Sequence, residues 1–237
     1  MKKYVRISEK LAIKVEAVKQ VLANVVADYN PATFASSFGA EDMVLMDLIC
    51  KFAPEIEIFT LDTGRLPKET YDVMQQVKAH YDQQVNVYFP DATDVETYIT
   101  QQGPNAFYYS VDLRKQCCGI RKVKPLKRAL TDKKSWLTGM RRSQAVTRSE
   151  LPVSERDEDH GLQKFSPLTD WSNGDVWAYI KAFDVPYNKL HDQGFASIGC
   201  APCTRAITAG EDIRAGRWWW ENPESKECGL HVKATEI

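Results

Sequence analysis

Apolar residues recur along the chain at two different spacings. A helical spacing comes first: after Ser8, apolar side chains return every three or four positions, with lysine and glutamate between them. These residues are Leu11, Val15, Val18, Leu22 and Val25. The pattern predicts an amphipathic helix that has Ser8 as its cap and packs its apolar face on a sheet.

Short apolar runs then alternate with helical patterns. The runs expected to form strands are 32–37, 56–61, 85–89 and 135–139. The helical patterns cover 43–52, 68–81, 94–100 and 122–130, and a proline precedes the second of them. Strands that alternate with helices form a parallel sheet. The predicted fold class is therefore α/β, with a doubly wound, mostly parallel sheet.

The pattern weakens in the second half of the chain. Residues 141–163 are charged and poor in apolar side chains, so we expect an exposed loop there. A short strand near Phe165 and a helix capped by Ser172 or Asn173 are expected to follow.

The last stretch, residues 214–237, contains three consecutive tryptophans but no regular pattern. We interpret it as a tail that can close over a site. The expected organisation is a single α/β nucleotide-binding domain, residues 1–213, that carries any metal site and is followed by this tail.

Charge and composition argue against two classes of partner. The 237 residues include 31 basic and 32 acidic side chains, and a net charge of -1 gives no overall attraction to nucleic acid or to an anionic membrane. No apolar run has the length of a membrane span, and the N-terminus leads into a charged helix rather than a signal core. We expect a cytoplasmic protein. In that reducing compartment its cysteines favour metal binding or catalysis over disulfides.

Two pairs of cysteines offer a ligand set. Cys117 and Cys118 are adjacent, and Cys200 and Cys203 form a Cys-x-x-Cys hairpin. Four thiolates are the number that a tetrahedral zinc ion or a four-iron cluster requires, and the spacing leaves both options open. Cys50 lies in an apolar run without a partner nearby, so we assign it to the core.

A further thiol, Cys228, stands outside both pairs. A free thiol has a pKa of about 8.5 and becomes a good nucleophile when nearby cations lower that value. Arg214, Arg217 and His231 are candidates for this role because they share the same stretch of sequence.

Two polar turns follow predicted strands. Residues 36–39, Ser-Ser-Phe-Gly, and residues 61–64, Leu-Asp-Thr-Gly, come where strands end. Ligands of doubly wound sheets bind beyond the carboxyl ends of the strands. The glycine of the first turn lets the backbone approach a phosphate, and its hydroxyls and the next helix's N–H groups could bind the anion.

These motifs together resemble the assimilatory adenylylsulfate (APS) reductases. The resemblance lies in Lys-x-Cys-Cys-x-x-Arg-Lys-x-x-Pro-Leu at 115–126, Cys-x-x-Cys at 200–203 and Glu-Cys-Gly-Leu-His at 227–231, together with residues 36–42 and 61–66. It covers nearly all of the chain after the first helix and implies an adenine nucleotide alpha-hydrolase-like fold. Relatives that cleave ATP carry Ser-Gly-Gly-x-Asp-Ser in the phosphate turn. This chain has Ser-Phe-Gly-Ala-Glu-Asp there, which argues against magnesium-assisted release of pyrophosphate.

The resemblance also implies roles for individual residues. It makes Cys228 the nucleophile and implies one [4Fe-4S] cluster per subunit. The implied cluster ligands are Cys117, Cys118, Cys200 and Cys203. The residues implied to bind substrate are Ser36, Ser37, Phe38, Gly39, Leu61 and Gly139 along the nucleotide, Lys122, Arg214 and Arg217 at the phosphosulfate, and His231 in the tail motif.

The implied chemistry fits the thiol chemistry of the sequence. The Cys228 thiolate attacks the sulfonyl sulfur of adenosine 5'-phosphosulfate (APS), AMP leaves, and the enzyme carries an S-sulfocysteine. No remaining cysteine is an obvious second thiol, so the reductant is expected from outside, and in the family it is thioredoxin. We expect the tail to open for it, the cluster to place Lys122 without passing electrons to substrate, and the subunits to form a homo-oligomer.

Three other interpretations remain open. The nearest is a reductase of the 3'-phosphorylated nucleotide, PAPS, although enzymes of that type generally lack the four ligand cysteines. An RNA-thiolating enzyme of the same fold is disfavoured by the neutral charge and the altered phosphate turn. A metal-stapled binding or sensor module without catalysis would leave Cys228, Arg214 and Arg217 unexplained.

Overall fold

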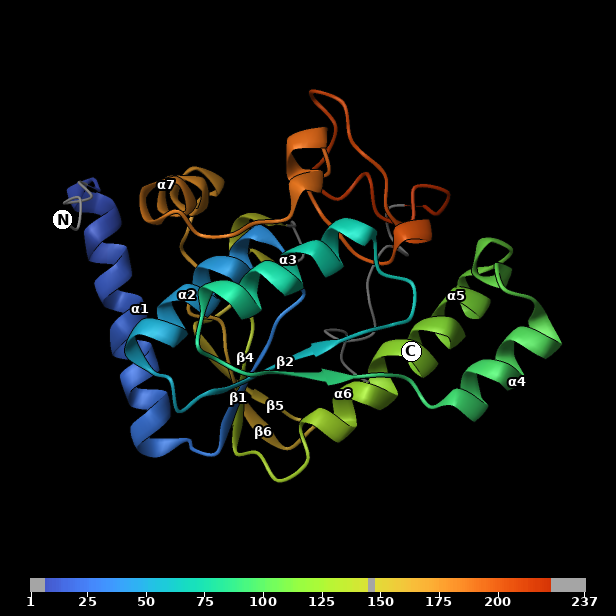
Figure 1. Cartoon of the computed structure of the whole chain (residues 1–237), viewed down its shortest axis with the longest axis horizontal. Coiled ribbons are helices and arrows are strands. Elements are labelled where there is room, and N and C mark those ends of the chain that lie inside the picture. The colour runs from blue at the N-terminus through green and yellow to red at the C-terminus, as the bar shows by residue number, and fades with distance from the viewer. Residues whose placement is uncertain (1–6, 145–147, 223–237) are drawn as a thin grey trace. The chain divides into compact units, whose positions relative to one another are not determined.

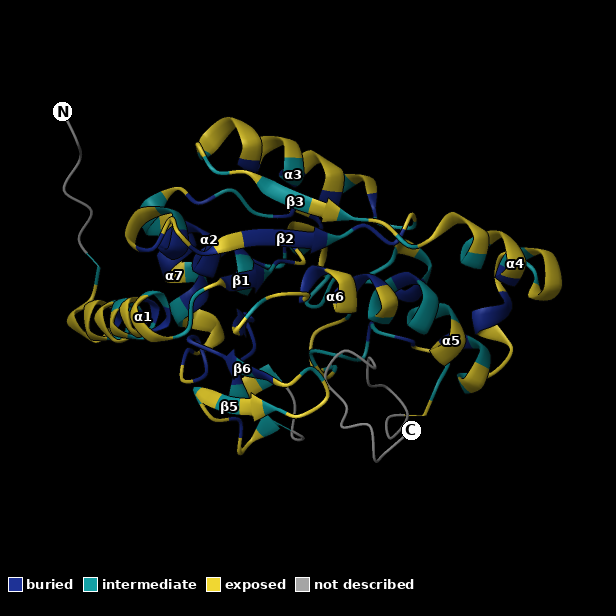
Figure 2. Ribbon diagram, turned by 90° about the horizontal axis from the view of Figure 1, so that it is seen from below, coloured by how far each residue is buried: buried dark blue, intermediate teal, exposed yellow. Residues whose placement is uncertain are grey.

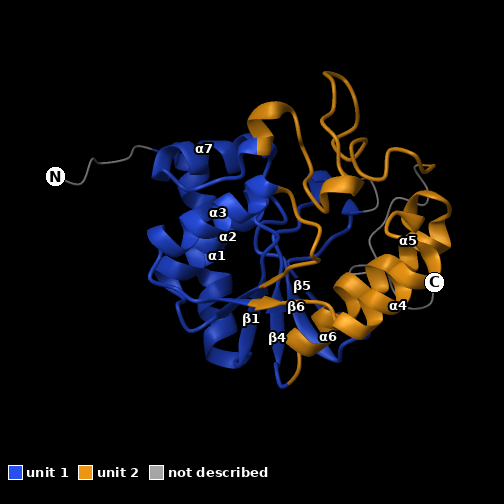
Figure 3. Ribbon diagram, turned by 45° about the vertical axis from the view of Figure 1, so that its right-hand side comes forward, with its two compact units in different colours: residues 1–59, 68–86, 132–189 blue, residues 60–67, 87–131, 190–237 orange. Residues whose placement is uncertain are grey.

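The computed structural model describes residues 7–144 and 148–222. The chain forms two compact units (Figure 3): unit 1 comprises 1–59, 68–86 and 132–189, and unit 2 comprises 60–67, 87–131 and 190–237. Residues 214–222 thus belong to unit 2. The expected division of the chain at residue 213 stays a prediction, because the rest of the tail lies outside the described residues.

Six strands form one sheet in the order β3-β2-β1-β4-β6-β5 (Figure 1). Their bounds are β1 Ala32–Ala35, β2 Glu57–Leu61, β3 Val85–Tyr88, β4 Ser135–Leu137, β5 Ser154–Asp157 and β6 Leu162–Phe165. β1 pairs in parallel with β2 and β4, and β4 pairs in parallel with β6. The predicted mostly parallel α/β sheet is confirmed. Because the strand order reverses direction at β1, the edge beyond β1 and β4 is the switch point where doubly wound sheets bind ligands.

Helices of unit 1 bury the apolar faces that the sequence predicts. α1, Glu9–Asp28, is capped by Ser8, whose Oγ accepts the N–H of Leu11 at 3.2 Å. α2, Ala40–Phe52, is buried from Met43 to Ile49 (Figure 2), which explains the nearly continuous apolar sequence of that stretch. α3 spans Lys68–His80, and α7, Asn173–Phe183, begins with a capping box on Ser172. The helix caps predicted at residues 8 and 172 are confirmed.

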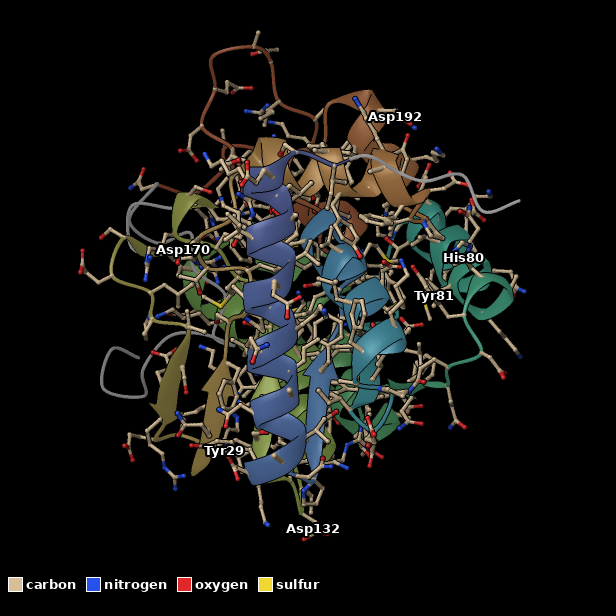
Figure 4. The ribbon with its side chains drawn as sticks, turned by 90° about the vertical axis from the view of Figure 1, so that its left-hand side faces the viewer. Tyr29, His80, Tyr81, Asp132, Asp170 and Asp192 are labelled. Carbon is tan, nitrogen blue, oxygen red and sulfur yellow. The ribbon has the colours of Figure 1, made fainter. Side chains whose placement is uncertain are left out.

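A buried carboxylate links these helices. Asp47 on α2 accepts the hydroxyls of Tyr179 at 2.6 Å and Tyr81 at 2.9 Å, and it pairs with Lys51 at 2.6 Å. Figure 4 labels Tyr81 at the end of α3. Burial raises the pKa of both tyrosines, so the hydroxyls stay protonated and act as donors. The network thus gives the buried carboxylate of Asp47 and both tyrosine hydroxyls hydrogen-bond partners.

The exposed loop predicted for 141–163 is wrong for part of its length, because the stretch contains a 3₁₀ turn at Arg142–Gln144 and the strand β5. β5 pairs antiparallel with β6, which confirms the short strand expected near Phe165. β5 is the polar edge strand of the sheet, and its alternating exposed and half-buried residues explain why it lacks an apolar run. Arg141 is fully buried because it forms an ion pair with Glu41.

Unit 2 contains short helical segments. They are α4 Ala92–Gln102, η1 Ala106–Tyr108, α5 Val111–Cys118, the π-helical turn η2 Gly119–Val123, α6 Lys124–Ala129, and the 3₁₀ turns η5 Lys189–Gln193, which begins at the unit boundary, and η6 Ala201–Cys203. The sequence predicted helices for 94–100 and 122–130, which α4 and α6 confirm, and it missed α5. The only residue of α5 classed as buried is Arg114, so α5 has no apolar stripe, although Ser110 caps it by accepting the N–H of Leu113.

None of the helices in the described part of the chain combines the length and the apolar character of a membrane span.

Candidate active site

Four cysteines from two distant segments line one open recess of about 320 Å³ in unit 2, which we name the thiol recess. Its cysteines are Cys117, Cys118, Cys200 and Cys203. Its cations are Arg65, Arg114, Arg121 and Lys122, and Phe107 and Pro202 complete the lining. The structure therefore brings together the ligand set that the sequence proposed, with positive charge around it.

Helix geometry places the first pair of thiols. Cys117 and Cys118 end α5, and the π-helical turn η2 follows at once and carries Arg121 and Lys122. Such π-turns occur often at functional sites. Arg121 is 7% exposed, and its Nη1 donates to the carbonyl of Thr63 at 2.6 Å. The cation is thus fixed beside the recess.

The second pair of thiols sits on a tight turn. The N–H of Cys203 donates to the carbonyl of Cys200 at 2.9 Å, and the N–H of Ala201 donates to the carbonyl of Arg65 at 2.8 Å. Thr63 Oγ1 lies 3.2 Å from Cys200 Sγ. The Asp-Thr-Gly turn after β2, whose Gly64 has a φ of +69°, therefore supports the cysteine turn. Sequence reasoning gave this threonine no role in the thiol site.

Burial dominates the electrostatics of these thiols. It raises the pKa of Cys203 to about 12, assisted by Cys200 and opposed by Arg217 and Lys122. Burial also raises the pKa of Cys117, against the effect of Arg121. Thiols in such a setting stay protonated unless a metal ion binds their sulfur atoms and displaces the protons.

The donor set can be tested against a metal centre. Among the described residues no three carboxylate, imidazole or thiol groups are already placed to hold a metal ion, so the recess is not a preformed coordination sphere. Its lining nevertheless offers four sulfur donors and, in the described part of the chain, no carboxylate or imidazole. Sulfur-only sites take zinc or iron–sulfur clusters. The four cysteines fit either group.

In unit 1, the Ser36–Gly39 turn follows β1 and leads into the N-terminus of α2. Ser37 donates both its N–H and its hydroxyl to Asp42 Oδ2, at 2.7 and 2.6 Å, and Ser36 Oγ accepts the N–H of Phe38 at 3.2 Å. Phe38 is buried with a φ of +58°, a backbone state uncommon for large residues. Both serine hydroxyls thus take part in shaping the turn that was predicted to hold a phosphate.

Gly139, after β4, lies against the same turn. Its N–H hydrogen-bonds to the carboxylate of Asp42. The neighbouring carboxylate of Glu41 accepts from Nε of the buried Arg141 at 3.0 Å. Glu41 stands where the ATP-cleaving relatives carry their aspartate, and here it is engaged in an ion pair.

Gly139→Ala and Gly39→Ala should differ sharply. A Cβ on Gly139 would stand 2.2 Å from Asp42 Oδ1 and 3.1 Å from its backbone nitrogen, whereas a Cβ on Gly39 meets nothing nearer than 3.5 Å. We expect Gly139→Ala to destabilise the protein by roughly 1–3 kcal/mol, measured by urea unfolding. Gly39→Ala should fold normally but bind AMP at least about tenfold more weakly if the backbone of this turn touches phosphate. Equal unfolding curves for the two variants would contradict the first expectation.

Asp42 should make stability depend on pH. Burial raises the pKa of its carboxyl to about 6, although bonds from Ser37 and Gly139 oppose the shift. The folded state then holds this proton more tightly than the unfolded state, so the contribution is full below about pH 4 and is lost as the pH rises through about 6. The loss should be roughly 1–3 kcal/mol, and Asp42→Asn should abolish it in urea unfolding at a series of pH values. Parallel pH profiles for the two proteins would show that Asp42 is not the source.

The remaining predicted residues are distributed as follows. Lys122 lines the thiol recess, and Leu61 is the half-buried last residue of β2. Arg217 is half-buried, pairs its backbone with Thr204, and stacks on Trp218 at 4.6 Å. Arg214 is half-buried, and its N–H donates to Asp212 Oδ1 at 2.8 Å. Cys228 and His231 lie outside the described residues.

Comparison with known proteins finds relatives that are similar over most of the chain. Adenosine 5'-phosphosulfate reductase of Allochromatium vinosum is 51% identical over 224 residues, 94% of this chain and 88% of that protein. The enzyme of the same name from Neisseria meningitidis serogroup A is 52% identical over 222 residues, 93% of this chain and 91% of that protein.

Solved structures show the same fold. Phosphoadenylyl-sulfate (PAPS) reductase from Candida auris, in a phosphate complex, superposes with a TM-score of 0.69 and 29% identity over 86% of this chain and 99% of that chain. FMN adenylyltransferase from Candida glabrata in complex with ATP superposes with a TM-score of 0.59 at 14% identity, over 94% of this chain and 79% of that chain. The expected adenine nucleotide alpha-hydrolase-like fold is thereby confirmed. Residues 31–206 match the phosphoadenosine phosphosulfate reductase domain, and the chain belongs to that family.

Proposed function

We propose that this chain is an adenosine 5'-phosphosulfate reductase, which reduces APS to sulfite and AMP in sulfate assimilation. The observation that carries the proposal is the thiol recess, where two distant cysteine pairs meet among four cations. The names of relatives that are about half identical over more than nine tenths of the chain support the same substrate.

The reaction proceeds in two displacements. The Cys228 thiolate attacks the sulfonyl sulfur of APS, the bond from that sulfur to the bridging phosphate oxygen breaks, and AMP leaves with the electron pair. Cys228 then carries an S-sulfo group. A thiolate of a dithiol reductant attacks the Cys228 sulfur and expels sulfite, and its second thiol resolves the mixed disulfide. The dithiol supplies the two electrons and returns Cys228 as a thiol.

Binding of APS divides between two groups of residues. The Ser36–Gly39 turn, Leu61 and Gly139 hold the nucleotide, where the N–H groups that open α2 suit an anion. Lys122, Arg214 and Arg217 hold the phosphosulfate and offset charge that develops on the leaving AMP. His231 contributes from the tail.

A [4Fe-4S] cluster, one per subunit, is the cofactor we assign to the thiol recess. Cys117, Cys118, Cys200 and Cys203 would hold it, since they are the sulfur donors of the recess. When bound it would supply a fixed charge centre that stabilises the thiolates and the cations beside them. Arg121, tied to the Thr63 carbonyl, and Lys122 on the same turn supply positive charge next to that centre.

Thioredoxin is the proposed reductant. Besides Cys228 and the four cysteines of the recess the chain contains only Cys50, which lies on α2 and packs, partly buried, against the core of unit 1. Burial raises the pKa of Cys50 to about 11, which leaves it a poor attacking thiol. An external dithiol protein therefore has to provide the second displacement.

Mass spectrometry after mixing tests the proposal. The protein, purified without oxygen, is mixed with APS and no reductant, and a second sample receives PAPS. We expect one added SO₃ group per chain on the Cys228 peptide, stoichiometric release of AMP, and release of sulfite when thioredoxin is added. Labelling with PAPS but not APS would instead favour the activity named for the Candida auris structure. Sulfite formation without any protein adduct would overturn the mechanism.

A further inference from the structure

A buried ion pair joins α5 to the last described segment of the chain. Arg114 donates from Nε to Glu221 Oε1 at 2.9 Å and from Nη2 to Oε2 at 2.8 Å. The two side chains are 1% and 3% exposed. Two parallel bonds between planar groups fix orientation as well as distance. Glu221 therefore has a defined place relative to α5.

The segment before Glu221 is held by the same helix and by the cysteine turn. The guanidinium carbons of Arg114 and Arg217 each lie 4.6 Å from the ring centroid of Trp218. Trp218 is 1% exposed, packs with Phe107 and Cys203, and donates its backbone N–H to the Cys203 carbonyl at 3.2 Å. Residues 217–221 are thus attached to both cysteine-bearing segments of unit 2.

Stability alone does not account for this pair. Taking two charges out of water costs several kcal/mol each, and apolar side chains of similar size often give equal or better stability. An apolar pair lacks the two parallel hydrogen bonds between guanidinium and carboxylate, which fix the orientation of one side chain relative to the other. Arg114 stands three residues before Cys117 and itself lines the thiol recess, so the ion pair fixes the segment at the recess.

We propose that Arg114 and Glu221 are positioning residues that fix the starting point of the tail carrying Cys228. The inference rests on the proposed function, since it takes Cys228 as the nucleophile. Cys228 is the seventh residue after Glu221, a reach of at most about 25 Å. Without the attachment at 217–221, the next fixed point would be Ile207, whose N–H donates to the carbonyl of Gly194 at 2.9 Å, 21 residues before Cys228.

Tether length sets the size of the effect. For a flexible linker, effective concentration falls roughly as the −3/2 power of length, and on that rule a change from 7 to 21 residues lowers it about fivefold. Loss of orientation adds to this. Because Glu221→Gln leaves the buried Arg114 charge without its partner, we expect the whole segment to detach. Formation of S-sulfocysteine should slow about 10- to 100-fold.

Single-turnover sulfonation of Cys228 at saturating APS tests the inference, with labelling followed by quench and mass spectrometry. Glu221→Gln should slow labelling 10- to 100-fold even at saturating APS, while visible absorbance stays at the wild-type value. APS affinity should also fall, because Arg217 detaches with the segment. Glu211→Gln is the matched control, because it breaks a similar but partly exposed pair with Arg205. It should label at the wild-type rate.

A double variant separates positioning from stability. Arg114→Met with Glu221→Met removes both charges without leaving one unpaired, so it should fold even if Glu221→Gln does not. We expect it to label slowly as well. Wild-type labelling rates in either folded variant would overturn the inference. If the wild-type protein itself gave no adduct on Cys228, the proposed function would fail instead.

Discussion

Replacing Cys228 with serine should reduce sulfite formation from APS by at least about a thousandfold. A serine hydroxyl is a far weaker nucleophile than a thiolate at neutral pH, and loss of a catalytic nucleophile commonly costs this much or more in kcat. Cys228→Ser should also lose the SO₃ adduct completely. Binding of APS should stay within about twofold, because the thiol acts on the sulfur only as the reaction proceeds. Sulfite release and intact mass are the two measurements.

Cys50→Ser is the matched control for that variant. Cys50 is partly buried against the core of unit 1, and burial raises its pKa, so its loss should leave both sulfite release and adduct formation unchanged. Substantial turnover by Cys228→Ser would mean that another sulfur accepts the sulfonate. Loss of activity in both variants would point to general damage to the fold.

The sheet could be predicted from sequence because its strands are buried and apolar. β1, β2 and β4 read as short apolar runs between helical patterns, and this alternation predicts parallel pairing but not the order of the strands in the sheet. β5 could not be found in this way, because an edge strand with one solvated side needs no apolar run. α5 was missed for a related reason: it buries an arginine rather than an apolar stripe.

The candidate site was predictable where a short motif carries the chemistry. The adjacent pair Cys117–Cys118 and the Cys-x-x-Cys hairpin at 200–203 indicated a ligand set, and the structure brings all four cysteines to one recess. Thr63, Arg114 and Glu221 gave no such signal, because each acts through a partner far away in sequence: Thr63 beside Cys200, and Arg114 with Glu221. A single arginine or glutamate in a polar stretch most often lies in solvent. Only the fold shows that this pair is buried.

Replacing Cys203 with serine should prevent binding of the proposed [4Fe-4S] cluster and abolish the proposed activity. Cys203 is 9% exposed and packs with Phe107 and Trp218, so it is the most enclosed of the four thiols. A serine hydroxyl is a poor ligand for iron, and a neutral hydroxyl there would leave three thiolates for a four-thiolate centre. We expect iron and sulfide content to fall at least about fivefold and sulfite formation at least about a hundredfold. The effect is large because Cys203 is expected both to bind the cluster and to hold Phe107 and Trp218 in place.

The effect should extend beyond the metal. The carbonyl of Cys203 accepts the N–H of Trp218, and the backbone of Thr204 pairs with that of Arg217. Collapse of the cysteine turn should therefore also release residues 217–221. Limited proteolysis should then cut residues 205–222 faster in Cys203→Ser than in the Cys50→Ser control. Visible absorbance of protein purified without oxygen decides the metal: a brown wild type and a colourless variant support the iron–sulfur assignment. A colourless wild type that contains zinc and still makes sulfite would contradict the iron–sulfur assignment. Full activity of Cys203→Ser would show that the thiol recess has no role in catalysis.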